Sequence, residues 1–140
     1  MMTRMIFVNL PVTDLKRSMT FYQSIGFANN PQFTDATSTC MVWSETINVM
    51  LHLPEKWRKF TKRPIPPATS SEVMLAIGCD SRKQVDEMNT AAAANGGTAD
   101  INPKQDHGFM YNRNLADPDG HVWEAMWMDM SAMAAAGTKG

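Results

Sequence analysis

The sequence has little of what marks secreted, metal-binding or membrane proteins. Only two of its 140 residues are cysteines, Cys40 and Cys79, and both lie inside apolar runs. We interpret them as reduced core thiols rather than as a disulfide framework or a zinc site. No apolar run approaches the roughly 20 residues needed to cross a bilayer, and the first residues lack the apolar core of a signal peptide. We therefore expect a cytoplasmic protein that does not work in a membrane.

A strong charge of one sign and the common catalytic motifs are also missing. The formal net charge is −1, which argues against nucleic acid or an anionic membrane as the main partner. Gly-x-Ser-x-Gly, phosphate-binding glycine loops and HExxH do not occur. The sequence therefore shows no nucleophile constellation, and any chemistry has to come from isolated carboxylates or histidines.

The residues that are present suit one globular domain, with 44% hydrophobic and 19% charged residues. The first half reads as a strand over 5–12, a helix capped by Asp14 and ended by Gly26, and then three β-like runs. These runs cover 27–33, 38–43 and 46–53. The first half is therefore expected to be one strand, one helix and three strands.

The second half repeats this order. A buried strand over 73–78 precedes a helix that Ser81 and Gln84 open as a capping box, and the helix ends at 95–97. Short strands are expected at 98–101, 109–115 and 121–128. A long period that occurs only twice indicates a duplicated module. We expect one domain over 5–128, with module one at 5–53, a linker at 54–71, module two at 72–128 and a flexible tail at 129–140.

The linker contains Pro64-Ile65-Pro66-Pro67 and at most one helical turn near 56–60. Five of the eight residues from Lys56 to Arg63 are basic. This stretch is either an ordinary solvated face or a basic lip that attracts an anionic small molecule. The sequence leaves both interpretations open.

Two stretches resemble the vicinal oxygen chelate superfamily, the glyoxalase, bleomycin-resistance and extradiol-dioxygenase group. They are Val12-Thr13-Asp14-Leu15 with Ser18, Phe21-Tyr22 and Gly26-Phe27, and Asp117-Pro118-Asp119-Gly120-His121-Val122-Trp123-Glu124. The resemblance implies an α+β fold in which two βαβββ modules form curved mixed sheets around a small-molecule cavity. It also implies a homodimer, because the open edge of each module needs a second module, within the chain or swapped between subunits.

Glu124 is the leading candidate for a functional residue. In the last strand, alternation puts Val122, Glu124 and Met126 on one face. In the metal-dependent members of the superfamily, four side chains from four strands surround a divalent cation. Glu124 matches the last of these ligand positions. Counting back from Asp14 and Asp80 places two other positions on apolar residues, Phe7 and Met74. The fourth position falls on His52 or Met50.

At best, Glu124 and His52 remain as metal ligands, fewer than catalytic sites use, so we expect no cofactor and no tightly held metal. A degenerate divalent site on these two residues is the alternative. The other residues expected to line the cavity are Phe7, Asn9, Met50, Met74, Tyr111, Arg113 and Met126. Because apolar residues stand at ligand positions, the favoured function is binding of a small apolar or planar molecule. The alternatives are a glyoxalase-like lyase or isomerase with Glu124 as base, and a structural dimer with a vestigial site.

Overall fold

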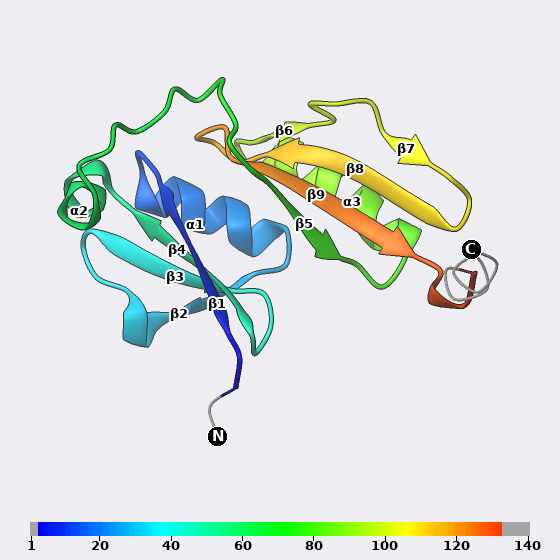
Figure 1. The fold of residues 1–140 in the computed structure, drawn as a ribbon, viewed down its shortest axis with the longest axis horizontal. Coiled ribbons are helices and arrows are strands. Elements are labelled where there is room, and N and C mark those ends of the chain that lie inside the picture. The colour runs from blue at the N-terminus through cyan, green and yellow to red at the C-terminus, as the bar shows by residue number, and fades with distance from the viewer. Residues whose placement is uncertain (1–2, 133–140) are drawn as a thin grey trace.

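The computed structural model describes residues 3–132 (Figure 1). The first module contains a four-stranded sheet in the order β1-β4-β3-β2. Strands β1 and β4 are parallel, and the other two pairs are antiparallel. Its elements are β1 (Ile6–Pro11), α1 (Leu15–Ser24), β2 (Ala28–Asn30), the 3-10 helix η1 (Pro31–Phe33), β3 (Ser38–Val42) and β4 (Ile47–His52).

The second module repeats this topology, with its sheet in the order β5-β9-β8-β6. Strands β5 and β9 are parallel, and a short extra strand, β7, pairs with β8. Its elements are β5 (Met74–Gly78), α3 (Arg82–Ala94), β6 (Thr98–Ala99), β7 (Gln105–Asp106), β8 (Met110–Ala116) and β9 (Val122–Met128). The α+β fold of two βαβββ modules is confirmed. Within residues 3–132, no helix is both long enough and apolar enough to span a membrane.

The two long helices begin where side chains cap their free backbone N–H groups. The Asp14 carboxylate accepts a hydrogen bond from the Arg17 backbone N–H at 3.0 Å. The Ser81 hydroxyl accepts from Gln84 N–H at 3.1 Å, and the Gln84 side chain accepts from the N–H before the cap. Gly26 leaves α1 with a φ of 114°, which favours glycine. Both helix starts follow the sequence prediction.

The structure differs from the sequence prediction in three local elements. The strand expected over 27–33 ends at Asn30, because Pro31 lacks a backbone N–H and the Asn30 side chain caps a 3-10 turn. The linker holds a full helix, α2 (Pro54–Phe60), rather than a single turn. Strand β7 was not expected, because two residues are too few to give a periodic pattern. Most of the predicted tail, from residue 133 onward, lies outside the described residues.

Both long helices lie behind the sheets in the view of Figure 1. The core consists of alternate strand residues that point toward the helices, among them Leu10, Val49, Leu51, Ile77, Leu115 and Trp123. The residues between them point the other way, onto what we call the open face of each sheet. Each open face therefore carries side chains that the two long helices do not cover.

A buried hydrogen-bond network joins the two modules. Tyr22 of α1 donates to the Asp117 carboxylate at 2.7 Å, and the Trp123 indole donates to the Tyr22 hydroxyl at 3.0 Å. Nearby, Thr13 donates to Asp119 from its hydroxyl at 2.7 Å. Burial, and then the Asp117 carboxylate, raise the pKa of Tyr22. The two signature stretches thus meet in space and hold the modules together.

Candidate functional site

Glu124 lies on the open face of the second sheet, partly buried between two neighbouring strands. It is opposite Ala76 of β5 on one side and Asn114 of β8 on the other. The Asn114 amide donates to the Glu124 carboxylate at 3.4 Å, and Asn102 donates to the Asn114 carbonyl at 3.0 Å. Asn102 thus orients the Asn114 side-chain amide toward the Glu124 carboxylate. The hydrogen bond from Asn114 to Glu124 is nevertheless long and therefore weak.

Small residues leave room beside this carboxylate. Ala76 and Gly78 are the two open-face residues of β5 that follow Met74. A Cβ added at Gly78 would have no neighbour within 4 Å. Met74 itself is 57% exposed. The surface next to Glu124 is therefore open, with apolar and amide groups around a single acid.

On the open face of the first sheet, His52 is 2% exposed and fully hydrogen-bonded. Its Nε2 lies 2.8 Å from Asn9 Oδ1, and its Nδ1 lies 2.7 Å from Ser38 Oγ. Because Asn9 Oδ1 only accepts, Nε2 carries the proton and Nδ1 accepts from Ser38. Burial, and then the Lys56 charge, lower the pKa of His52. The ring is thus held neutral, and Phe60 of α2 packs on it with ring centroids 5.0 Å apart.

The register of the sheets shows which first-module residue corresponds to Glu124. The N-cap of α3 is Ser81, so Met74 lies seven residues before its N-cap, as Phe7 lies seven before Asp14. Phe7 is opposite Asn48 in β4, and Met74 is opposite Val122 in β9. Two residues further along β4 and β9, Met50 in the first module corresponds to Glu124 in the second. His52 therefore lies two residues beyond the equivalent position.

This donor set does not fit a divalent metal. The four equivalent positions are Phe7, Met50, Met74 and Glu124, and only the last offers an oxygen ligand. Both nitrogens of His52 are already hydrogen-bonded, and His52 and Glu124 lie on different sheets. Among residues 3–132, no three His, Cys, Asp or Glu side chains are grouped so that they can hold a metal ion.

The expectation that Tyr111 and Arg113 share a site with Glu124 was wrong. Both point toward α3, on the face opposite Glu124. The Tyr111 hydroxyl donates to Asp86 at 2.6 Å, and Arg113 pairs with Asp86 at 2.9 Å and with Asp100 at 2.6 Å. Arg113 lowers the pKa of Asp100 by hydrogen bonding. These residues stabilise the packing of α3 on its sheet.

The open-face residues of β8 are instead Asn112 and Asn114, which the sequence analysis missed. Asn112 is opposite Met126, and Asn114 is opposite Glu124. Alternation alone makes Asn112 and Asn114 share a face, but only the pairing register shows that it is the face of Glu124. Of the remaining predicted residues, Met126 lies on this face, and Phe7, Asn9 and Met50 lie with His52 on the open face of the first sheet.

Comparisons with known proteins agree with this architecture. Residues 4–44, from β1 through β3, match the bleomycin resistance protein-like N-terminal family. A glyoxalase/bleomycin resistance protein/dioxygenase family enzyme from Burkholderia phytofirmans PsJN superposes with a TM-score of 0.73 over 90% of this chain and 99% of that one, at 18% identity. The chain has the vicinal oxygen chelate fold. The family resemblance expected from the two signature stretches is confirmed at the level of the fold.

Two further structures of this fold come from proteins named for antibiotic resistance. A fosfomycin resistance protein from Listeria monocytogenes has a TM-score of 0.65 at 16% identity, covering 91% of this chain and 92% of that one. The bleomycin resistance determinant of transposon Tn5 has a TM-score of 0.61 at 17% identity, covering 91% and 99%. No curated protein matches this sequence.

Proposed function

We propose that this vicinal oxygen chelate protein binds a small apolar or planar molecule on its open sheet faces, without a tightly held metal or other cofactor. The observation that carries the proposal is the composition of these faces. Phe7 and Met74, at positions equivalent to metal ligands, are 48% and 57% exposed. Large apolar side chains left in solvent mark surfaces that bind something.

The polar groups define what such a ligand should carry. Its body packs on Met74, Met126 and the small residues of β5. A hydrogen-bond donor on the ligand meets the Glu124 carboxylate, whose only hydrogen bond within residues 3–132 is the long one from Asn114. The two resistance proteins that share the fold are named for small organic molecules, which is compatible with a ligand of this size.

The second candidate is a lyase or isomerase in which Glu124 acts as a general base on a carbonyl compound. It is favoured by the same weak contact at 3.4 Å, because a carboxylate without strong partners is free to take a proton from a substrate. The carboxylate would abstract the proton next to the carbonyl and return it at another position. The third candidate is a structural dimer in which the open faces bind nothing.

Glu124→Gln separates the three candidates, because it keeps the shape of the side chain and removes its charge. We expect metal-free protein to be stabilised by members of a panel of planar apolar compounds in a thermal-shift screen, and added divalent metal ions to cause no shift. The Gln variant should keep affinity for its best compound within about tenfold, the size of one lost charged hydrogen bond. Glu87→Gln, an exposed site on α3, is the matched control.

Other outcomes contradict this proposal. If the Gln variant binds normally but loses turnover of a carbonyl substrate, the base mechanism is correct. Saturable metal binding contradicts the metal-free site. No stabilisation by any compound in the panel leaves only the structural dimer.

We also propose that the protein is a homodimer. Strands β1 and β5 end their sheets, and within the described residues no strand of one sheet pairs with a strand of the other. Apolar side chains at the start of both strands are about half exposed: Met5, Ile6, Phe7, Val73 and Met74. Unpaired strand edges with apolar side chains favour pairing with another copy.

Sedimentation at tens of micromolar protein should therefore give twice the chain mass. Ile6→Lys, in β1, should shift the protein to monomer, since a buried interface disfavours an unpaired charge. Phe33→Lys, at an exposed apolar residue outside these strands, should remain dimeric. A wild-type protein with the mass of a single chain at these concentrations rules out the dimer.

A further inference from the structure

The basic stretch noted in the sequence folds around a hollow. Arg58, Lys62 and Arg63 line a cavity of about 400 Å³ together with Thr61, Pro64 and Ile65. Five cations occur from Lys56 to Arg63, and no acidic residue interrupts them. None of the five forms an ion pair with another part of residues 3–132, whereas Arg82 and Arg113 do. The cations that line this basic hollow are therefore not held in ion pairs within the described residues.

A second, apolar cavity lies between the modules, where the end of β1 approaches the start of β5 and of β9. It has a volume of about 180 Å³. Its walls are mostly apolar side chains, from Leu10, Pro11, Trp57, Pro66, Val73, Leu75 and Val122. Of the open-face residues described above, only Asn9 and Val122 take part in these walls. The apolar cavity is thus largely separate from the surface around Glu124.

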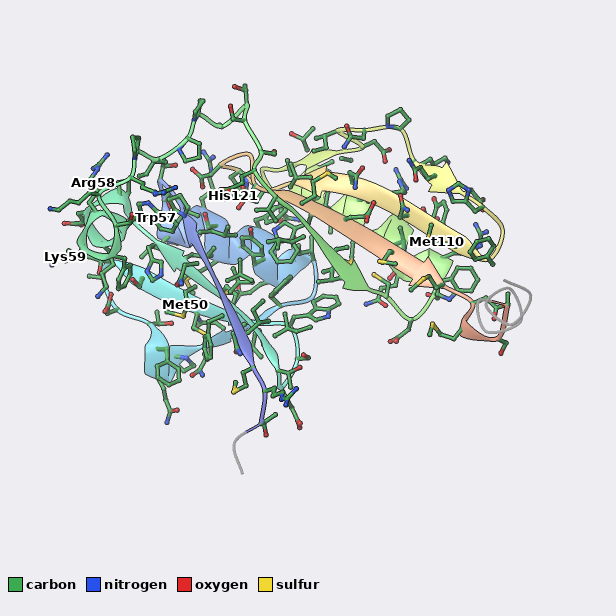
Figure 2. The ribbon with its side chains drawn as sticks, viewed as in Figure 1. Met50, Trp57, Arg58, Lys59, Met110 and His121 are labelled. Carbon is green, nitrogen blue, oxygen red and sulfur yellow. The ribbon has the colours of Figure 1, made fainter. Side chains whose placement is uncertain are left out.

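A third hollow, of about 740 Å³, connects the other two under the linker. It shares Thr61 and Arg63 with the basic hollow and Trp57, Pro66 and Ser70 with the apolar cavity. Figure 2 shows Trp57 on the side of α2 that faces the rest of the molecule, with Arg58 and Lys59 on its outer side. The three hollows form one groove, basic at its outer end and apolar at its inner end. We call it the linker groove.

We infer that the linker groove binds an anionic amphiphile, a molecule with an aliphatic or aromatic body and one carboxylate, sulfonate or phosphonate head. The body fills the apolar cavity, and the head lies among Arg58, Lys62 and Arg63. Arg side chains suit such heads because their N–H groups match two oxygens at once. This inference goes beyond the proposed open-face site and does not depend on it.

The acidic groups of the groove fix the direction in which the ligand enters. Glu72 lines both the apolar cavity and the connecting hollow, and Asp119 lies beside them in an adjacent hollow. A negative head placed at the inner end would share the apolar cavity with the Glu72 carboxylate, and no Lys or Arg lines that cavity. Repulsion there and attraction at the basic hollow both favour the head at the outer end. His121 also lines the inner end, where its ring bonds to the Pro11 carbonyl at 2.6 Å.

Octanoate and its neutral analogue octanamide test this arrangement. We expect calorimetry at low salt to show that octanoate binds more tightly than octanamide, and that the difference narrows at high salt. The variant Arg58→Gln/Lys62→Gln/Arg63→Gln should bind octanoate about tenfold more weakly at low salt and octanamide with unchanged affinity. Lys16→Gln/Lys83→Gln/Lys104→Gln removes the same charge elsewhere and should change octanoate affinity less than twofold.

The apolar end has its own test. Val73 is 53% exposed, so Val73→Glu should leave the chain folded while it places a charge at the inner end. Val73→Glu should lower the affinity for both octanoate and octanamide at least about tenfold, because desolvating a carboxylate beside an apolar ligand body is unfavourable. Because Val73 also lies at the strand edges proposed to pair in the dimer, Ile6→Lys, at these edges but outside the groove lining, is the matched control and should leave octanoate affinity unchanged. Glu124→Gln should leave octanoate affinity unchanged, which separates a failure here from a failure of the open-face proposal.

Several results would overturn the inference. These are equal octanoate affinity in the wild type and the triple Arg/Lys variant, an equal loss in the Lys16/Lys83/Lys104 control, and no binding of octanoate by the wild type. Binding to phosphatidylglycerol vesicles without binding to dissolved octanoate would also overturn it, because it assigns the cations to a membrane surface.

Discussion

Replacing Asp117 by alanine is expected to destabilise the protein by about 3 kcal/mol or more. The Asp117 side chain is 3% exposed and accepts hydrogen bonds from the Tyr22 hydroxyl and from the backbone N–H groups of Asp119 and His121. Alanine leaves all three donors without this acceptor in a buried site. The loss spans both modules, because Tyr22 belongs to α1 and Asp117 to the turn before β9. Urea unfolding, followed by tryptophan fluorescence, measures it.

Two matched variants show whether the effect comes from this network. Asp117→Asn keeps one carbonyl oxygen for the backbone donors and should cost only about 1 kcal/mol. Asp119→Ala removes a more exposed carboxylate that bonds to Thr13, and should also cost about 1 kcal/mol. If all three variants unfold at the same urea concentration, the buried network does not hold the modules together.

This network explains what the second signature stretch does. The sequence predicted a tight turn from Asp117 to Gly120, and Gly120 has the positive φ of 90° that such a turn requires. What could not be predicted is that the turn binds Thr13 and Tyr22, about a hundred residues earlier in the chain. Contacts between residues so far apart depend on the packing of whole modules, which local patterns do not encode. The signature stabilises the fold and only indirectly places Glu124.

The sequence could predict which residues of one strand share a face of the candidate site. Alternation within β9 correctly grouped Val122, Glu124 and Met126. It gave no information on how β8 pairs with β9, so Tyr111 was expected near Glu124 in place of Asn114. A shift of one residue in register exchanges the two faces of a strand. Periodicity therefore fixed the faces within one strand, while the pairing between strands required the structure.

The choice between His52 and Met50 depended on the alignment of β4 with β9, because the two residues share a face and alternation cannot separate them. The sequence left both possibilities open, whereas the strand pairing places Asn48 opposite Phe7 and Val122 opposite Met74. With this alignment, Met50 corresponds to Glu124. The hydrogen bonds of His52 to Asn9 and Ser38 give that histidine a structural role. The sequence analysis expected Asn9 and His52 in one cavity but did not place Ser38 of β3 beside them.

Gly97 lies where β8 of its own module and α1 of the first module both approach the backbone closely, so a side chain has no room there. A Cβ added there would overlap the Ala116 carbonyl oxygen and the ring of Phe21, the side chain that α1 inserts between the modules. Gly97→Ala is therefore expected to destabilise the protein by about 3 kcal/mol or more, because a backbone oxygen cannot move aside as a flexible side chain can. The loss should appear as a lower urea midpoint.

Gly78→Ala is the matched control, because the same methyl group at Gly78 meets nothing within 4 Å. Gly78 lies in a strand, where alanine costs less conformational entropy, so this variant should be neutral or more stable by about 0.5 kcal/mol. Adding Phe21→Leu to Gly97→Ala should recover part of the loss by removing the ring contact, while the contact with the Ala116 carbonyl persists. Equal urea midpoints for Gly97→Ala and Gly78→Ala would show that α1 does not pack as closely against the second module as the fold requires.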